Sequence, residues 1–163
     1  MNEILVRFVR GAGWDSRAIE WRTAAWCSHV EAVLPGSRTL GAMLIGGVRV
    51  RNFTDRCYRD VERAEIWSVP CTEFQQAAFY SFLYSQVGKP YDWRAIVQLI
   101  AWRGQQPGRK WKEPDCWFCS ELQPAAMNHA DVWSIPDELP GNCIVPVVNY
   151  GMVAVTDGAR LAA

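Results

Sequence analysis

The chain has 163 residues, a length that fits one domain and allows roughly 70% of the unfolded surface to be buried. Half of the residues are hydrophobic and nine are tryptophan, which excludes a disordered or low-complexity protein. The 17 basic and 17 acidic side chains cancel, so no overall charge favours nucleic acid or an anionic membrane as a partner. We therefore predict a single folded domain over residues 1–163.

The sequence contains no run of 18 apolar residues, so no membrane-spanning segment is predicted. The start, Met1 to Gly11, is too short and too charged for the hydrophobic region of a secretory signal. Six cysteines without such a signal indicate cytoplasmic synthesis with free thiols, a pattern that a component of a virus particle would share. The one basic stretch, Arg103 to Lys112, is interpreted as a solvated loop.

Strands dominate the first half of the chain. Glycine and proline turns end the apolar runs, and Val48–Arg51 alternates valine with arginine as a half-buried strand does. A short helix is predicted up to Arg22, with Asp15 or Ser16 as the residue that caps its start. The predicted strands cover residues 4–9, 28–34, 39–45, 48–51 and 64–69.

Helices dominate the second half. Apolar residues recur at helical spacing over Glu73–Val87, and Gly88 follows as a stop signal. Asp92 could cap a helix that runs through Trp102, and a further helix is predicted to end near Ala130. The segment Ile144–Val155 is interpreted as a tail with a preference for β structure. This order predicts an α+β fold in which a small antiparallel sheet or barrel packs against helices.

The predicted helix that ends near Ala130 starts with a cysteine in a position that suits a nucleophile. Ser120 and Gln123 have the spacing of a capping box, and Pro124 is best tolerated in a first turn. The helix is therefore predicted to begin at Cys119 or Ser120. A helix N-terminus carries partial positive charge that favours a thiolate, and its amides can bind an oxyanion. Cys119 is a candidate nucleophile, and the alternative is a buried core thiol.

The chain has two histidines that could serve as the base for this thiol. His129 lies ten residues beyond Cys119 on the same predicted helix, about 15 Å away along a continuous helix axis. His29 lies on a predicted strand, and Glu31 shares its face of that strand. A carboxylate in this position can orient an imidazole and stabilise its charged form. We therefore predict His29 as the base and Glu31 as the group that orients it.

Three segments together resemble the circularly permuted, NlpC-like branch of the papain-like cysteine amidases. They are Ser28–Glu31 on an early strand, Gly88–Trp93, and Trp117–Leu122 around the cysteine. In that branch the histidine precedes the cysteine in the chain, and its members are encoded by bacteria and bacteriophages. The resemblance covers roughly residues 4–130.

The resemblance implies a papain-like fold with Cys119 as nucleophile, His29 as base and Tyr91 in the substrate cleft. It also implies hydrolysis of an amide in a peptide or small molecule through a thioester, without a cofactor, with bacterial cell-wall peptides as candidate substrates. Relatives commonly place a polar third residue on the strand after the histidine. Here that position falls on the segment Leu40–Ala42, which is apolar, so Glu31 is the replacement candidate.

Two other interpretations compete with a hydrolase. Cys116 and Cys119 have the spacing of half a zinc site, which His29 or Cys27 might complete, but no second cysteine pair has ligand spacing. We predict no metal. The more serious alternative is a non-catalytic component of a phage tail that keeps the fold and only binds partner proteins, because the expected third polar residue is missing.

Overall fold

The computed structural model describes residues 2–94, 97, 115–136 and 144–162, and its centre is a six-stranded sheet. The strand order is β4-β3-β2-β1-β5-β6, and each neighbouring pair is antiparallel. The bounds are β1 Asn2–Gly11, β2 His29–Leu34, β3 Arg38–Met43, β4 Gly47–Asn52, β5 Val61–Cys71 and β6 Arg160–Leu161. The predicted α+β class, with an antiparallel sheet packed against helices, is confirmed.

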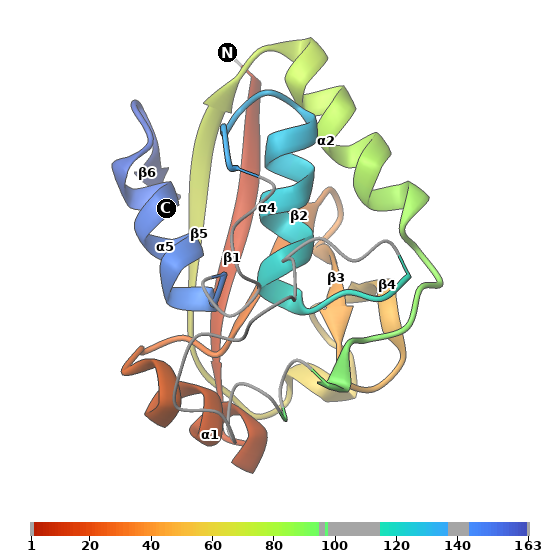
Figure 1. Ribbon diagram of the computed structural model, residues 1–163, viewed down its shortest axis with the longest axis vertical. Coiled ribbons are helices and arrows are strands. Elements are labelled where there is room, and N and C mark those ends of the chain that lie inside the picture. Colours follow the sequence, from red (N-terminus) through yellow and green to blue (C-terminus); the bar gives the residue numbers. More distant parts are fainter. Residues whose placement is uncertain (1, 95–96, 98–114, 137–143, 163) are drawn as a thin grey trace.

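Helices lie mainly on one face of this sheet (Figure 1). They are α1 Trp14–Thr23, α2 Glu73–Ser85, α4 Cys119–His129 and α5 Pro146–Val155, and a single 3₁₀ turn covers Arg56–Tyr58. Helix α4 packs against β2, β3 and α2, and its residues from Cys119 to Met127 are all buried. The main core joins this helix to the strands through Phe8, Val30, Leu40 and Leu122. The sheet and α2 therefore fix the position of α4.

The tail of the chain corrects one sequence prediction. Ile144–Val155 was expected to favour β structure, but Pro146–Val155 forms helix α5. Proline at the first helical position lacks only an N–H that would have no partner in the helix, and its fixed φ suits a helix start. The ring of Tyr150 then packs edge-on against Phe8, Trp26 and Trp67, with centroids 5.2–5.5 Å apart. This tertiary packing outweighs the β propensity of the valines.

The start of α4 confirms one prediction and corrects another. The helix begins at Cys119, as predicted, after Phe118 in an extended conformation. Ser120 and Gln123 do not form the expected capping box, because both are buried and bond distant carbonyls. Ser120 Oγ donates to the Ile144 oxygen at 2.6 Å, and Gln123 Nε2 donates to the Leu40 oxygen at 3.1 Å. The amide of Phe118 is instead bonded by the Glu121 carboxylate at 3.4 Å.

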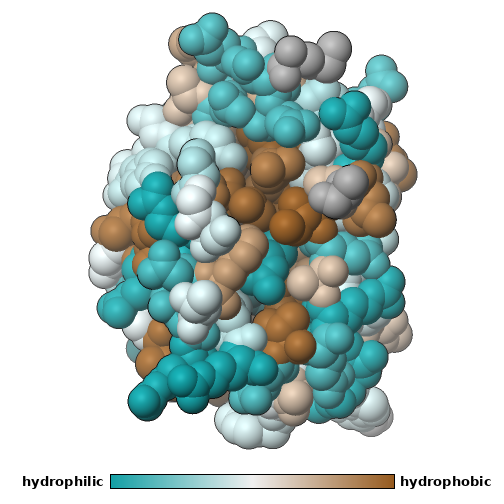
Figure 2. All heavy atoms as spheres, turned by 180° about the vertical axis from the view of Figure 1, so that it is seen from behind, coloured by the Kyte–Doolittle hydropathy of each residue, from teal (hydrophilic) through white to brown (hydrophobic). Residues whose placement is uncertain are grey.

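The opposite side of the molecule has a mixed surface. Figure 2 shows hydrophobic side chains gathered near the middle of this side with hydrophilic ones around them. Within the described part of the chain, no helix has the length and apolar character that crossing a membrane requires. The basic stretch 103–112 lies outside the described residues, so its interpretation as a loop stays a prediction.

Candidate active site

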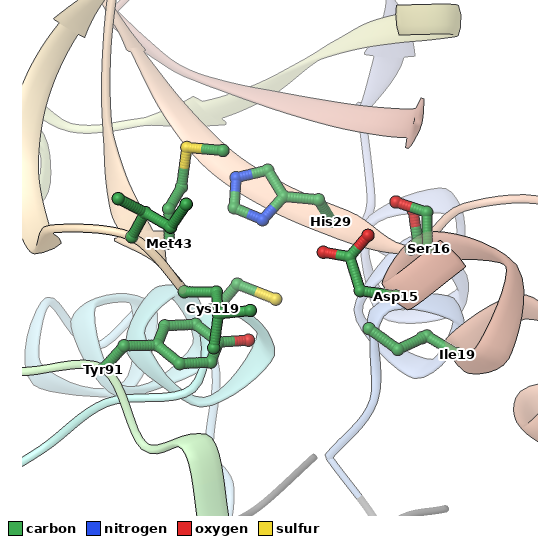
Figure 3. Close-up of a pocket in the computed structure, with 10 residues that line it drawn as sticks. Asp15, Ser16, Ile19, His29, Met43, Tyr91 and Cys119 are labelled. Carbon is green, nitrogen blue, oxygen red and sulfur yellow. The ribbon is translucent and has the colours of Figure 1, made fainter. Parts of the chain in front are cut away.

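Cys119 is the first residue of α4 and lines a pocket with a volume of about 180 Å³. Cys119 is 1% exposed, and the side chains of His29 and Tyr91 line the same pocket beside it (Figure 3). This position places Cys119 in the first turn of the helix, whose amides carry partial positive charge. The structure thus brings the predicted cysteine and the predicted histidine together, although 90 residues separate them in the chain.

His29 is the first residue of β2, and its ring lies between two acidic groups. One ring nitrogen, Nε2, is 3.3 Å from Glu31 Oε2, and the other nitrogen is turned toward Cys119 (Figure 3). Burial alone would lower the pKa of His29, but the hydrogen bonds and charges of Cys119 and Glu31 raise it to about 10. The ring is therefore held as an imidazolium over a wide pH range, as a partner for a thiolate requires.

Glu31 is completely buried, and both of its oxygens have partners. Arg7 Nη1 donates to Oε1 at 2.9 Å, and the Tyr58 hydroxyl donates to Oε2 at 2.5 Å. Burial alone would raise the pKa of Glu31, but the hydrogen bonds from His29 and Tyr58 and the charge of Arg7 lower it. A buried carboxylate that stays ionised in this way can orient the His29 ring and balance its charge.

Glycine at position 41 makes room for Glu31. A Cβ atom at Gly41 would lie 2.9 Å from Glu31 Cβ, closer than Cβ atoms in folded proteins approach other atoms. Gly41 lies in the apolar segment Leu40–Ala42, where relatives were expected to carry the third polar residue. The carboxylate beside His29 therefore comes from β2 itself, while β3 contributes a glycine that leaves space for it.

The pocket has a polar floor and an apolar wall. Tyr91 lies beside Cys119, as expected for a residue of the cleft, and is fixed by a bridge to Trp117 and by edge contact with Phe118. Burial, followed by the charge and hydrogen bond of Cys119, raises the pKa of Tyr91 well above its usual range. The other lining residues are Ser28, which precedes His29 in the segment Ser28–Glu31, and Asp15, Ser16, Ile19, Met43, Leu44 and Ile45. The last six were not predicted as site residues, because only the packing of α1 and of the end of β3 with its following turn brings them here.

The cysteine pair does not fit a metal site in the part of the chain that is described. No group of three or more histidine, cysteine or acidic side chains is arranged to hold an ion among those residues. Cys27, which the zinc interpretation considered as a ligand, is a buried free thiol. Its burial, followed by the charge of Cys119, raises its pKa to about 12, so it resists the deprotonation that metal binding requires.

Comparison with known proteins supports the fold. No protein-family model matches the sequence, and no curated protein is significantly similar to it. Among solved structures, the chain is similar to the crystal structure of the metalloprotein YiiX from Escherichia coli O157:H7 (DUF1105). The TM-score is 0.60 at 18% identity, and the match covers 81% of this chain and 67% of the other. The comparison therefore shows an α+β arrangement shared with YiiX.

Proposed function

We propose that this protein is a cysteine-dependent amide hydrolase. The observation that carries the proposal is the arrangement of Cys119, His29 and Glu31: the thiol lies at a helix N-terminus in a pocket that His29 also lines, and the far nitrogen of His29 contacts Glu31. A nucleophile, a base and a group that orients the base are the parts that acyl transfer through a thiol requires. Because Glu31 reaches His29, the apolar segment 40–42 is no longer an argument against activity.

The proposed reaction has two halves. The Cys119 thiolate attacks the carbonyl carbon of the amide, and the amides at the start of α4 stabilise the oxyanion that forms. The His29 imidazolium gives its proton to the nitrogen as the C–N bond breaks, which releases an amine and leaves a thioester. Neutral His29 then takes a proton from water, whose oxygen attacks the thioester. The acid leaves, and the thiolate and imidazolium are restored.

The lining of the pocket indicates which part of a substrate it could contact. Met43, Leu44 and Ile45 supply apolar contact on one side. Peptides and small amides fit this description. The resemblance to NlpC-like amidases makes bacterial cell-wall peptides the first substrates to test.

Selective alkylation tests the proposal. Treatment with iodoacetamide at about pH 6, read by mass spectrometry of the cysteine peptides, should label Cys119 faster than the other five cysteines. Burial raises the pKa of Cys71 as well as that of Cys27, so neither is expected to compete. His29→Ala should slow the labelling of Cys119 at least tenfold, because the charge that stabilises the thiolate is lost.

The same experiment separates the hydrolase from the non-catalytic alternative. If Cys119 reacts no faster than Cys116, which is only partly buried, and His29→Ala changes nothing, the proposed hydrolase is wrong. A domain that only binds other proteins, such as a tail component, would then be preferred. Release of amine from peptide substrates, with Cys119→Ala as the control, provides the second measurement.

A further inference from the structure

The carboxylate beside His29 belongs to a larger buried cluster. Its members are Arg7 on β1, Glu31 on β2, Thr39 on β3 and Tyr58 in the 3₁₀ turn, and none of them is more than 8% exposed. Neighbouring residues on a strand point to opposite faces, and Val6, Phe8, Val30 and Leu40 point into the main core. The cluster therefore lies on the face of the sheet away from α4.

The hydrogen bonds of the cluster have one consistent direction. Glu31 is an ionised acceptor, so the Tyr58 hydroxyl must donate its single proton to it. Thr39 Oγ1, 2.7 Å from the same hydroxyl, must then be the donor of that contact. Thr39 donates to Tyr58, Tyr58 donates to Glu31, and Glu31 accepts from His29. A proton on Glu31 Oε2 would disturb this series of hydrogen bonds, because that oxygen already accepts from Tyr58 and His29.

Arg7 is held in place as firmly as the carboxylate it contacts. It lies directly opposite Glu31 in the β1–β2 pairing. Its guanidinium also stacks on aromatic rings, 4.6 Å from the centroid of Phe53 and 5.0 Å from that of Tyr58. Phe53 and Tyr58 both lie in the connection between β4 and β5, so this connection covers the Arg7 side of the cluster. A buried ion pair has a large desolvation cost, and its maintenance needs a reason beyond stability.

We propose that Arg7 and Tyr58 are positioning residues for catalysis. They keep Glu31 ionised and immobile, and Glu31 in turn holds the His29 ring with one nitrogen directed at Cys119. This inference rests on the proposed function, because it assigns these residues to the same reaction. It extends the site to two side chains that touch neither the pocket nor the thiol.

The proposal predicts an effect that depends on pH. Without the Arg7 charge, Glu31 would become protonated at a pH higher by about one unit or more. Arg7→Met should therefore slow alkylation of Cys119 several-fold at pH 5, relative to the unchanged protein, with a much smaller change at pH 8. Tyr58→Phe should act in the same direction and by less. Arg10→Met on the same strand and Tyr80→Phe, whose hydroxyl bonds the Val33 carbonyl instead, are matched controls expected to change neither rate.

A double-mutant cycle separates positioning from a purely structural role. In the background of Glu31→Gln, Tyr58→Phe should have no further effect on the pH dependence, because the carboxylate through which it acts is gone. If Arg7→Met proves unstable, Arg7→Met with Glu31→Gln removes both buried charges, and Tyr58→Phe still provides the test. A uniform loss at every pH, or an effect of Tyr58→Phe that persists without Glu31, would overturn the proposal.

These results distinguish the inference from the proposed function. If Cys119 is selectively labelled and depends on His29, but all variants of the cluster share the profile of the unchanged protein, only the positioning role is wrong. If Cys119 is not selectively labelled, the hydrolase and the positioning role are wrong together.

Discussion

The two sides of the His29 ring differ in what surrounds the ring. On the Glu31 side the groups are buried and both carboxylate oxygens are bonded. On the Cys119 side the ring faces a pocket, and the carboxylate of Asp15 in that pocket has no hydrogen bond or ion pair to a described residue. One side resembles a protein core, and the other has groups available to an incoming molecule.

This difference suggests how a catalytic base can be held in one orientation by buried groups on one side while substrate groups move on the other side. A base must stay aligned while the nucleophile, the leaving group and water exchange around it. In the proposed hydrolase, the buried cluster would align His29 at a cost in desolvation, and the pocket would admit the substrate. Substitutions on the closed side should therefore change stability and reactivity together, whereas substitutions on the pocket side should change reactivity alone.

The largest expected effect is on the pocket side, at the thiol itself. Cys119→Ala should abolish amide hydrolysis, a loss of at least about 10²–10⁴-fold, because no other described group occupies the position of the nucleophile. The free energy of unfolding should change by no more than about 1 kcal/mol, since only one sulfur atom is removed. Amine release and urea denaturation measure the two quantities. A large loss of stability would show that the Cys119 thiol contributes to the folded structure as the buried cluster does.

On the closed side, Glu31→Gln should lower the free energy of unfolding by about 3 kcal/mol at neutral pH. The substitution leaves the buried Arg7 charge without its counterion, and breaking a buried pair has this magnitude. Asp15→Asn is the matched control, because it makes the same change of charge in the pocket and should stay within about 0.5 kcal/mol. Equal effects of the two substitutions in urea denaturation would remove the distinction between the two sides.

The sequence predicted the pocket side of this site better than the closed side. Strand alternation placed Glu31 on the same face as His29, and the helix start together with the resemblance to NlpC-like amidases selected Cys119. Arg7 and Tyr58 were missed because they lie 24 and 27 residues from Glu31 in the chain, and no local pattern encodes pairing between strands. Helix α5 was misread for a related reason: its valines favour strands, and the packing of Tyr150 that decides the outcome is tertiary.

The free energy of unfolding should depend on pH through Glu31, on the buried side of His29. Because the pKa of Glu31 is lowered in the folded state, its ionised form stabilises the protein above its ordinary pKa of 4.5, and this contribution is lost as the pH falls. Each pH unit below that value should remove up to about 1.4 kcal/mol, and Glu31→Gln should lack this slope. Urea denaturation between pH 3 and pH 7 measures it. Parallel curves for the two proteins would show that Glu31 has the same pKa folded and unfolded.

The protonation of the His29 ring gives a second measure of the interaction between His29 and Glu31. The His29 signals in NMR should show a protonated imidazole up to about pH 10, since Cys119 and Glu31 outweigh the effect of burial on its pKa. Glu31→Gln should move the titration to lower pH by about one unit or more, because one of the two acidic partners is lost. A titration that is unchanged by this substitution would mean that Glu31 does not influence the base.

The space that Gly41 leaves beside Glu31 can be tested by filling it. Gly41→Ala should destabilise the protein by about 1–3 kcal/mol, because its Cβ would lie 2.9 Å from that of Glu31 and neither backbone can yield easily. Gly151→Ala is the control: nothing lies within 4 Å of its Cβ position in α5, and it should stabilise the helix by about 0.5–1 kcal/mol. The displaced Glu31 should also slow labelling of Cys119 several-fold, whereas Gly151→Ala should not. If Gly41→Ala were neutral in both measurements, the close contact between the two strands would not matter for holding the carboxylate, and the glycine would be incidental to the site.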